Sequence, residues 1–295
     1  MRRLGVVSTM LVMAFLTITA SAWAETSTTI CVPEAASKPV LSTNTKGECP
    51  SKGTKPVKYK AVTVPDPALL SHMNYLEKGV DGKPTIQFSG VNVQVVNGEG
   101  KTASTNGAGN IVIGYDENGG SHAQTGSHDL ILGEEQTFVD YGGLVAGSNN
   151  SILGPFDSVT GGRLNVAEGD EVSIGGGALN HAKGNESSVS GGRQNTADSL
   201  SSSVSGGYGN IASGPQSSVS GGTDNGATGP ASSVSGGNEN AASGSVVSIA
   251  GGSENSATGV GASVQGGFRN HAEGELSSIF GGDGLTATIE YEAIP

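Results

Sequence analysis

The chain has 295 residues, a formal net charge of -12 and 49 glycines, with 4% aromatic and 14% charged residues. Glycine is far above the roughly 7% of an average protein, but no strict Gly-X-Y period runs through the chain, which excludes collagen. The acidic balance argues against a nucleic-acid partner, because such proteins need a basic surface. So few large apolar residues also argue against a compact enzyme domain with an ordinary core.

Residues 1–24 have the features of a secretory signal peptide. Two arginines precede the uncharged apolar stretch 4–20, and Ala22-Trp23-Ala24 fits a cleavage site in front of Glu25. An uncleaved membrane anchor is the alternative, but the small-residue site favours cleavage. No later apolar run is long enough to span a bilayer. We therefore expect an exported mature chain, secreted or at the cell surface, with no transmembrane segment.

Residues 25–65 predict a small disulfide-stapled β-module and a linker. Cys31 and Cys49 are the two cysteines of the chain, and disulfides persist in exported proteins. A redox or metal pair is the alternative, but no C-x-x-C spacing or nearby histidine supports it. Five lysines cluster here (Lys46, Lys52, Lys55, Lys58 and Lys60). A solvated linker explains them better than a polyanion site does.

Residues 66–80 predict the one helix of the chain. Leu69, Leu70, Met73 and Leu76 recur at helical spacing within Asp66–Lys78. Gly79 follows as a C-cap. A helix of about three turns is unstable alone in water, so its apolar stripe should pack on the β region or on other copies of the chain.

Residues 81–142 predict an N-terminal β cap. Asn-Gly pairs mark turns between short apolar segments. Four segments are expected as strands: Thr85–Phe88, Val91–Val95, Ile111–Gly114 and Leu130–Gly133.

A repeat of 15 residues follows, without insertions, and reads S-V-x-G-G-x-x-N-x-A-x-G-x-x-x. Ten glycines mark the coils from Gly147 to Gly282, each with an aliphatic residue three positions earlier, from Leu144 to Ile279. An alanine stands five positions after the glycine in nine coils, from Ala167 to Ala287. An asparagine stands three positions after the glycine at Asn150, Asn165, Asn180, Asn195, Asn210, Asn225, Asn240, Asn255 and Asn270.

The repeat predicts an all-β fold, a parallel β-solenoid of about ten coils over residues 143–284. A unit of 15 residues cannot bury its own core, but stacked units pair each strand with its copy about 4.8 Å away. The aliphatic, alanine and asparagine positions then form interior columns. Stacked asparagine amides can bond to their copies, so we predict a structural ladder rather than a ligand site. Residues 285–295 alternate as one strand and should cap the rod.

The unit resembles the head repeats of trimeric autotransporter adhesins, the YadA-like (Hep/Hag) family. That family's motif is close to S-V-A-I-G-x-x-A-x-A-x-G-x-N, and Ser188-Val189-Ser190-Gly191-Gly192-Arg193-Gln194-Asn195-Thr196-Ala197 runs in the same frame. Gly191 replaces an isoleucine, Asn195 replaces an alanine, and the unit is one residue longer. The resemblance implies a left-handed β-roll packed as a trimer and used in surface adhesion. It covers about residues 143–284, and the family's coiled coil and membrane anchor have no counterpart up to Pro295.

No catalytic, cofactor or metal site is expected. Gly100-Lys101-Thr102 lacks the first glycine of a phosphate loop. No acidic residue recurs in a column as a calcium-binding roll requires, and His122 and His128 are better explained as solvated loop residues than as ligands. A solenoid enzyme such as a polysaccharide lyase would need clustered acids and bases.

Two non-enzymatic functions remain. The first is an adhesin-like or structural surface protein, a homo-oligomer with a trimer favoured, whose partner could be a surface glycan or a matrix protein. The alternative is an ice- or glycan-binding solenoid that uses its regular serine column. The variable neighbour two residues further on (Thr160, Gly175, Ser190, Ala250, Gln265 and Phe280) counts against a flat lattice match.

Overall fold

A computed structural model of the protein describes residues 28–33, 41–42, 59–64, 71–118 and 120–295. The predicted signal peptide lies outside these residues. The chain divides into two compact units, residues 1–93 and 94–295. The predicted all-β parallel solenoid is confirmed, with about 12 turns rather than ten.

The first unit contains a three-stranded antiparallel sheet in the order β2-β1-β3. Its strands are β1 (Thr28–Pro33), β2 (Leu41–Ser42) and β3 (Tyr59–Val64). Cys31 lies in β1, opposite Leu41 of β2. Cys49 lies outside the described residues, so the Cys31–Cys49 disulfide stays a prediction.

The predicted helix is wrong over its described part, because Met73–Leu76 forms strand β4. β4 pairs antiparallel with β5 (Thr85–Phe88), and Met73 faces Phe88 across the hairpin. A short 3-10 turn, η1 (Val80–Gly82), lies between them. A single short helix would have had no packing partner, whereas the hairpin satisfies the backbone of both segments. The expected strand Thr85–Phe88 is confirmed, but Val91–Val95 forms no strand.

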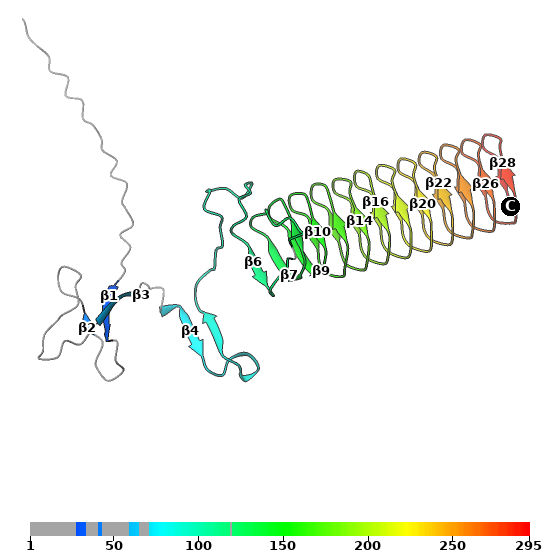
Figure 1. The fold of residues 1–295 in the computed structure, drawn as a ribbon. Helices are drawn as coiled ribbons and strands as arrows, with labels where there is room; N and C mark the ends of the chain where they lie inside the picture. The colour runs from blue at the N-terminus through cyan, green and yellow to red at the C-terminus, as the bar shows by residue number, and fades with distance from the viewer. Residues whose placement is uncertain (1–27, 34–40, 43–58, 65–70, 119) are drawn as a thin grey trace, which may run out of the picture. The chain divides into compact units, whose positions relative to one another are not determined.

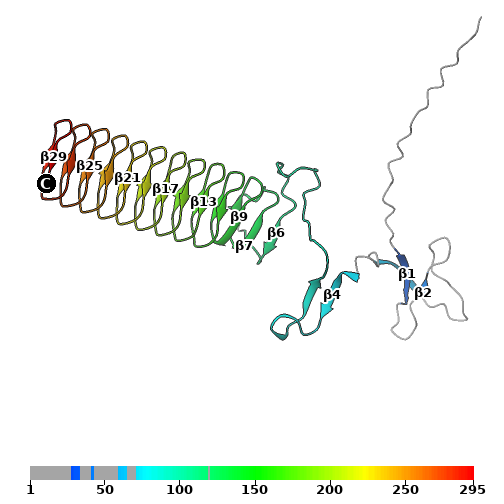
Figure 2. The ribbon, with the colours of Figure 1, turned by 180° about the vertical axis from the view of Figure 1, so that it is seen from behind.

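The second unit is the solenoid, built from two parallel sheets on opposite sides of each coil. Figure 1 shows the 11-stranded sheet in front, and Figure 2 shows the 13-stranded sheet from behind. The 13-stranded sheet contains β6 (Ile111–Ile113), β7 (Leu130–Glu134), β9 (Leu144–Ser148), β11 (Ser158–Val159), β13 (Ser173–Ile174), β15 (Ser188–Val189), β17 (Ser203–Val204), β19 (Ser218–Val219), β21 (Ser233–Val234), β23 (Ser248–Ile249), β25 (Ser263–Val264), β27 (Ser278–Ile279) and β29 (Ala293–Ile294).

The 11-stranded sheet follows each of these strands in the same coil. It contains β8 (Thr137–Phe138), β10 (Ser151–Ile152), β12 (Val166–Ala167), β14 (His181–Ala182), β16 (Thr196–Ala197), β18 (Ile211–Ala212), β20 (Gly226–Ala227), β22 (Ala241–Ala242), β24 (Ser256–Ala257), β26 (His271–Ala272) and β28 (Thr286–Ala287). The register advances by 15 residues, as between Ser188 and Ser203. Because identical positions stack, one sequence period gives continuous columns.

The solenoid begins before the regular repeat, and its first coils are shorter. β6 and β7 belong to the same sheet as the repeats. Val145, not the expected Leu144, continues the interior aliphatic column, since it pairs with Val159 and is 0% exposed. That step is 14 residues long, and the later coils contain one extra residue at the Gly161-Gly162 turn.

The end of the solenoid also differs from the expectation of a single cap strand. Residues 285–295 hold two short strands, β28 and β29, which pair with β26 and β27. They form a further coil of the same kind. The alternation of Leu285, Ala287 and Ile289 had suggested a continuous strand, but the coil turns after Ala287, which is fully buried.

The core consists of stacked columns with one small side chain per coil. The aliphatic column and the alanine column are buried along the solenoid. A third buried column starts at Asp157 and holds serines in most coils, with Val172, Val247 and Ala262 in the others. The hydroxyls of Ser187, Ser217, Ser232 and Ser277 have no hydrogen-bond partner.

This column predicts a matched pair of opposite stability changes. Ser217→Val should stabilise the solenoid by about 1 kcal/mol, because it removes a buried unpaired hydroxyl and adds buried apolar surface. Valine already fits this column at Val172 and Val247. Ser202→Val should destabilise it, because the Ser202 hydroxyl donates to the Ser199 carbonyl (2.7 Å) and accepts from the Ser199 amide (3.1 Å). Urea unfolding of both variants checks the opposite signs, and equal signs would contradict this explanation.

Candidate functional site: the serine face

The asparagine column lies inside the coils and is fully used there. Asn165, Asn180, Asn195, Asn210, Asn225, Asn240, Asn255 and Asn270 are all buried. The side-chain oxygen of each accepts the backbone N–H of the residue one coil later, as from Asn210 to Asn195 at 3.0 Å. The Asn195 amide group donates to the carbonyls of Gly191 (2.9 Å) and Gly207 (3.1 Å). No asparagine amide of this column therefore remains free for a ligand.

The column starts earlier than the sequence period indicated. Gln136 accepts the backbone N–H of Asn150 (3.1 Å), and Asp116 accepts that of Gln136 (3.1 Å). Sequence reasoning missed both residues because the coils here are not 15 residues long. At the other end, the Asn270 side chain accepts the N–H of Leu285 (3.0 Å).

Two buried carboxyl groups lie near the start of the solenoid. Burial raises the pKa of Asp129 to about 6, against the hydrogen bond from the Gly143 N–H. Burial also raises the pKa of Asp157 to about 6, although Val172 and Gly154 donate backbone hydrogen bonds to it. Both groups therefore favour the protonated form in the folded state.

The raised pKa values predict that acid stabilises the solenoid. A carboxyl whose folded pKa exceeds its unfolded value contributes stability that is present below about pH 4 and lost as the pH rises through about 6, by up to about 3 kcal/mol per group. The free energy of unfolding should therefore increase as the pH falls from 7.5 to 5. Urea titrations at several pH values measure this slope.

A matched control separates this effect from general charge repulsion. Asp157→Ser, which installs the residue found here in later coils, should flatten the slope. Asp198→Ser removes one exposed carboxylate and should leave the slope nearly unchanged. Equal slopes in the two variants would contradict the assignment to Asp157.

The outward side of the 13-stranded sheet presents two rows of small uncharged side chains, which we name the serine face. The first row is Ser158, Ser173, Ser188, Ser203, Ser218, Ser233, Ser248, Ser263 and Ser278. The second row is Thr160, Gly175, Ser190, Ser205, Ser220, Ser235, Ala250, Gln265 and Phe280. Rows on one side of a strand lie about 7 Å apart, and coils repeat every ~4.8 Å. The serine face is therefore a regular array of hydroxyls.

A row of glycines borders the serine face. A Cβ built on Gly161, Gly191, Gly206, Gly221, Gly236, Gly251, Gly266 or Gly281 meets no atom within 4 Å. Where Gly175 lacks a side chain, a shallow hollow of about 210 Å³ opens between Thr160 and Ser190. The Thr160 hydroxyl donates to the Gly175 carbonyl at its edge (2.9 Å). The surface is thus low, flat and open to a broad partner.

Charged groups lie elsewhere on the coils. His181 on β14 pairs with Glu168 (3.2 Å), and Lys183 approaches Asp198 (4.0 Å), both on the side of the 11-stranded sheet. Arg269 pairs with Glu254 at a turn (2.7 Å). The solenoid therefore has one uncharged side and one side that carries ion pairs.

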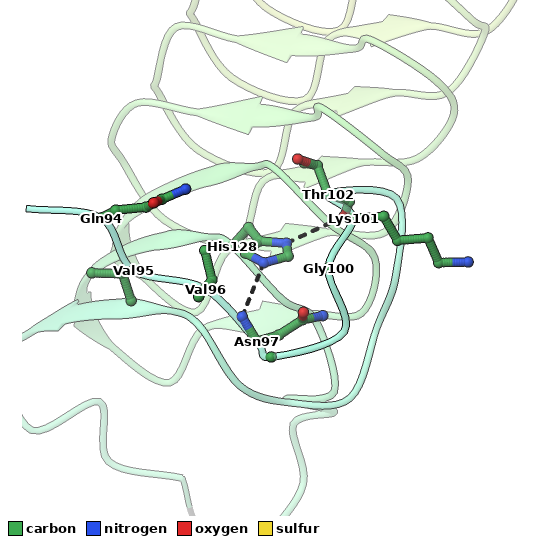
Figure 3. Close-up of a pocket in the computed structure, with 9 residues that line it drawn as sticks. Gln94, Val95, Val96, Asn97, Gly100, Lys101, Thr102 and His128 are labelled. Atoms are coloured by element: carbon green, nitrogen blue, oxygen red, sulfur yellow. Dashed lines mark hydrogen bonds between the residues drawn. The ribbon is translucent and has the colours of Figure 1, made fainter. Parts of the chain in front are cut away.

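A second hollow, of about 550 Å³, lies near the start of the solenoid and is lined by residues 94–98, 100–102 and 128 (Figure 3). His128 is engaged on both ring nitrogens: Nε2 accepts the Asn97 N–H (3.1 Å) and Nδ1 faces the Thr102 carbonyl (3.2 Å). His128 is therefore a structural clamp for this loop, not the solvated residue expected. The Lys101 side chain points away from His128.

His122 lies in another contact, with its Nδ1 3.1 Å from the Thr137 hydroxyl. Within the part of the chain that the structure describes, no group of three or more histidine, cysteine or acidic side chains is placed to hold a metal. No helix among the described residues is long and apolar enough to cross a membrane.

Comparisons with known proteins give no family for this chain. No family model matches the sequence, and no curated protein sequence matches it. The structural argument therefore rests on the serine face itself.

Proposed function

We propose that the protein is an exported, non-enzymatic β-solenoid with an adhesin-like or structural role at the cell surface. The observation that carries this proposal is the serine face, which repeats over nine coils without a charged side chain in an otherwise acidic solenoid. The interior amides are already satisfied, so contacts with a partner fall to the outside of the coils. The resemblance of the repeat unit to YadA-like heads supports the same role and a homo-oligomer, with a trimer favoured.

The partner that fits this face is an extended neutral surface, such as a glycan or a matrix protein. A regular hydroxyl array can donate and accept hydrogen bonds along its whole length, and many weak contacts add up through multivalency. A small-molecule pocket is a poor match, because such sites enclose most of their ligand.

A binding screen of the mature protein against glycans and matrix proteins tests this function. The proposal expects saturable binding to at least one neutral glycan or matrix protein, little reduced by salt because the face is uncharged. Absence of binding to every member of the screen, or binding that salt abolishes, would contradict it.

Ice binding is the second candidate, and one observation favours it. Four consecutive coils place serine in both rows, at Ser188/Ser190, Ser203/Ser205, Ser218/Ser220 and Ser233/Ser235. Gly175, Ala250, Gln265 and Phe280 interrupt the second row elsewhere. A thermal-hysteresis measurement on the same preparation distinguishes the two candidates, since an adhesin gives none.

A further inference from the structure

The hydrophobic core of the solenoid is open at its N-terminal end. Val112 of β6 pairs with Ile131 and stands first in the aliphatic column. Ile131 is 0% exposed, whereas Val112 is 47% exposed. β6 is the terminal strand of its sheet, so no described strand pairs with its outer edge. Solenoids require a cap at such an end, and an unpaired apolar edge is a template for another strand.

A strand of suitable pattern lies unused in the same sequence. Residues 91–96 alternate as Val-Asn-Val-Gln-Val before a final valine. They have no backbone hydrogen bond within the described residues. Val91, Val93, Val95 and Val96 are exposed, Val93 by 61%. Because side chains alternate along a strand, such a strand can place its valines on the core side and Asn92 and Gln94 outward.

Charge favours a second copy of this chain as the partner. Residues 116–295 carry 20 acidic and four basic side chains, so two solenoids repel each other. Residues 73–115 carry three acidic and three basic side chains and are neutral. Copies can therefore meet around residues 73–115 without this repulsion. An exchange of identical segments between copies also costs little, since each copy both gives and receives a strand.

We propose that residues 91–96 of one copy add to the free edge of β6 in another copy and close its core. The added strand supplies backbone hydrogen bonds to the β6 edge, and its valines cover Val112. This rests on the self-association included in the proposed function, and it names the surface through which the copies join. It also replaces the apolar helix predicted for that role.

Sedimentation and hydrogen exchange on the mature protein test the exchange of strands. The parent should be an oligomer at micromolar concentration. Val93→Asp and Val112→Asp should each weaken association about a hundredfold or more, since each places a charge in an apolar contact. Val260→Asp, at an exposed turn of the solenoid, is the matched control and should leave association unchanged.

Hydrogen exchange keeps the test valid if a variant folds poorly. In the parent, the amides of residues 92–96 should be protected at high protein concentration and lose protection on dilution. Protection that is independent of concentration would contradict the proposal, because the segment would then pack on its own chain. An oligomer in which these amides exchange freely would overturn the strand exchange while leaving self-association intact. A monomeric parent would overturn both.

Discussion

Gly207→Ala should prevent folding of the central coils or destabilise them by more than about 3 kcal/mol, whereas Gly206→Ala should change stability by less than about 0.5 kcal/mol. Gly207 has a φ of +91°, and a Cβ there would collide with the Gly222 carbonyl oxygen and the Asn210 amide. Gly206 has open space at its Cβ position. Thermal and urea unfolding of the two variants measures the difference.

The two glycines are adjacent, so the comparison controls itself. Both substitutions reduce the freedom of the unfolded chain equally, and only the native contacts differ. Similar stabilities of Gly206→Ala and Gly207→Ala would contradict the stacking of carbonyls over the second glycine of each Gly-Gly pair.

Asn210→Leu should destabilise the solenoid by about 3–6 kcal/mol. The Asn210 oxygen accepts the Asn225 N–H (3.0 Å), and its amide donates to the carbonyls of Gly206 (2.9 Å) and Gly222 (3.0 Å). Leucine removes these bonds and leaves buried groups unpaired, at about 1–3 kcal/mol each. The melting temperature and the urea midpoint report the loss.

Asn270→Leu is the control in the last asparagine coil. Its oxygen serves only Leu285, which is half-buried and can reach water. This variant should therefore melt above Asn210→Leu. An Asn210→Leu protein that melts like the parent but loses ligand binding would show that the column is a ligand site instead.

The repeat made most of the solenoid predictable from sequence. A strict period stacks identical positions, so the interior placement of Asn195, Ala197 and Val189 follows from their spacing alone. The hydrogen bonds within the asparagine column could not be predicted in detail. Stacked amides were expected to bond mainly to each other, but most of their bonds go to backbone groups, which only the coil geometry reveals.

The irregular part of the chain was harder to predict for a physical reason. Met73 and Leu76 fit a helical spacing as well as a short strand, and the hairpin with Thr85–Phe88 decides between them. Likewise, one residue fewer per coil shifts the register, so that Val145 replaces Leu144 in the core and Gln136 precedes Asn150. The serine face was predictable as a column, but the open hollow at Gly175 was not.

The most direct test of the serine face as the contact surface compares two lysine substitutions on opposite sides of the same coils. Ser205→Lys places a charge in the serine face, and Ile211→Lys places the same charge at an exposed outward position of β18 in the 11-stranded sheet. Both variants should melt like the parent. Binding to the ligand found in the screen should fall at least tenfold in Ser205→Lys and stay unchanged in Ile211→Lys. Full binding by Ser205→Lys, or loss only in Ile211→Lys, would contradict the account.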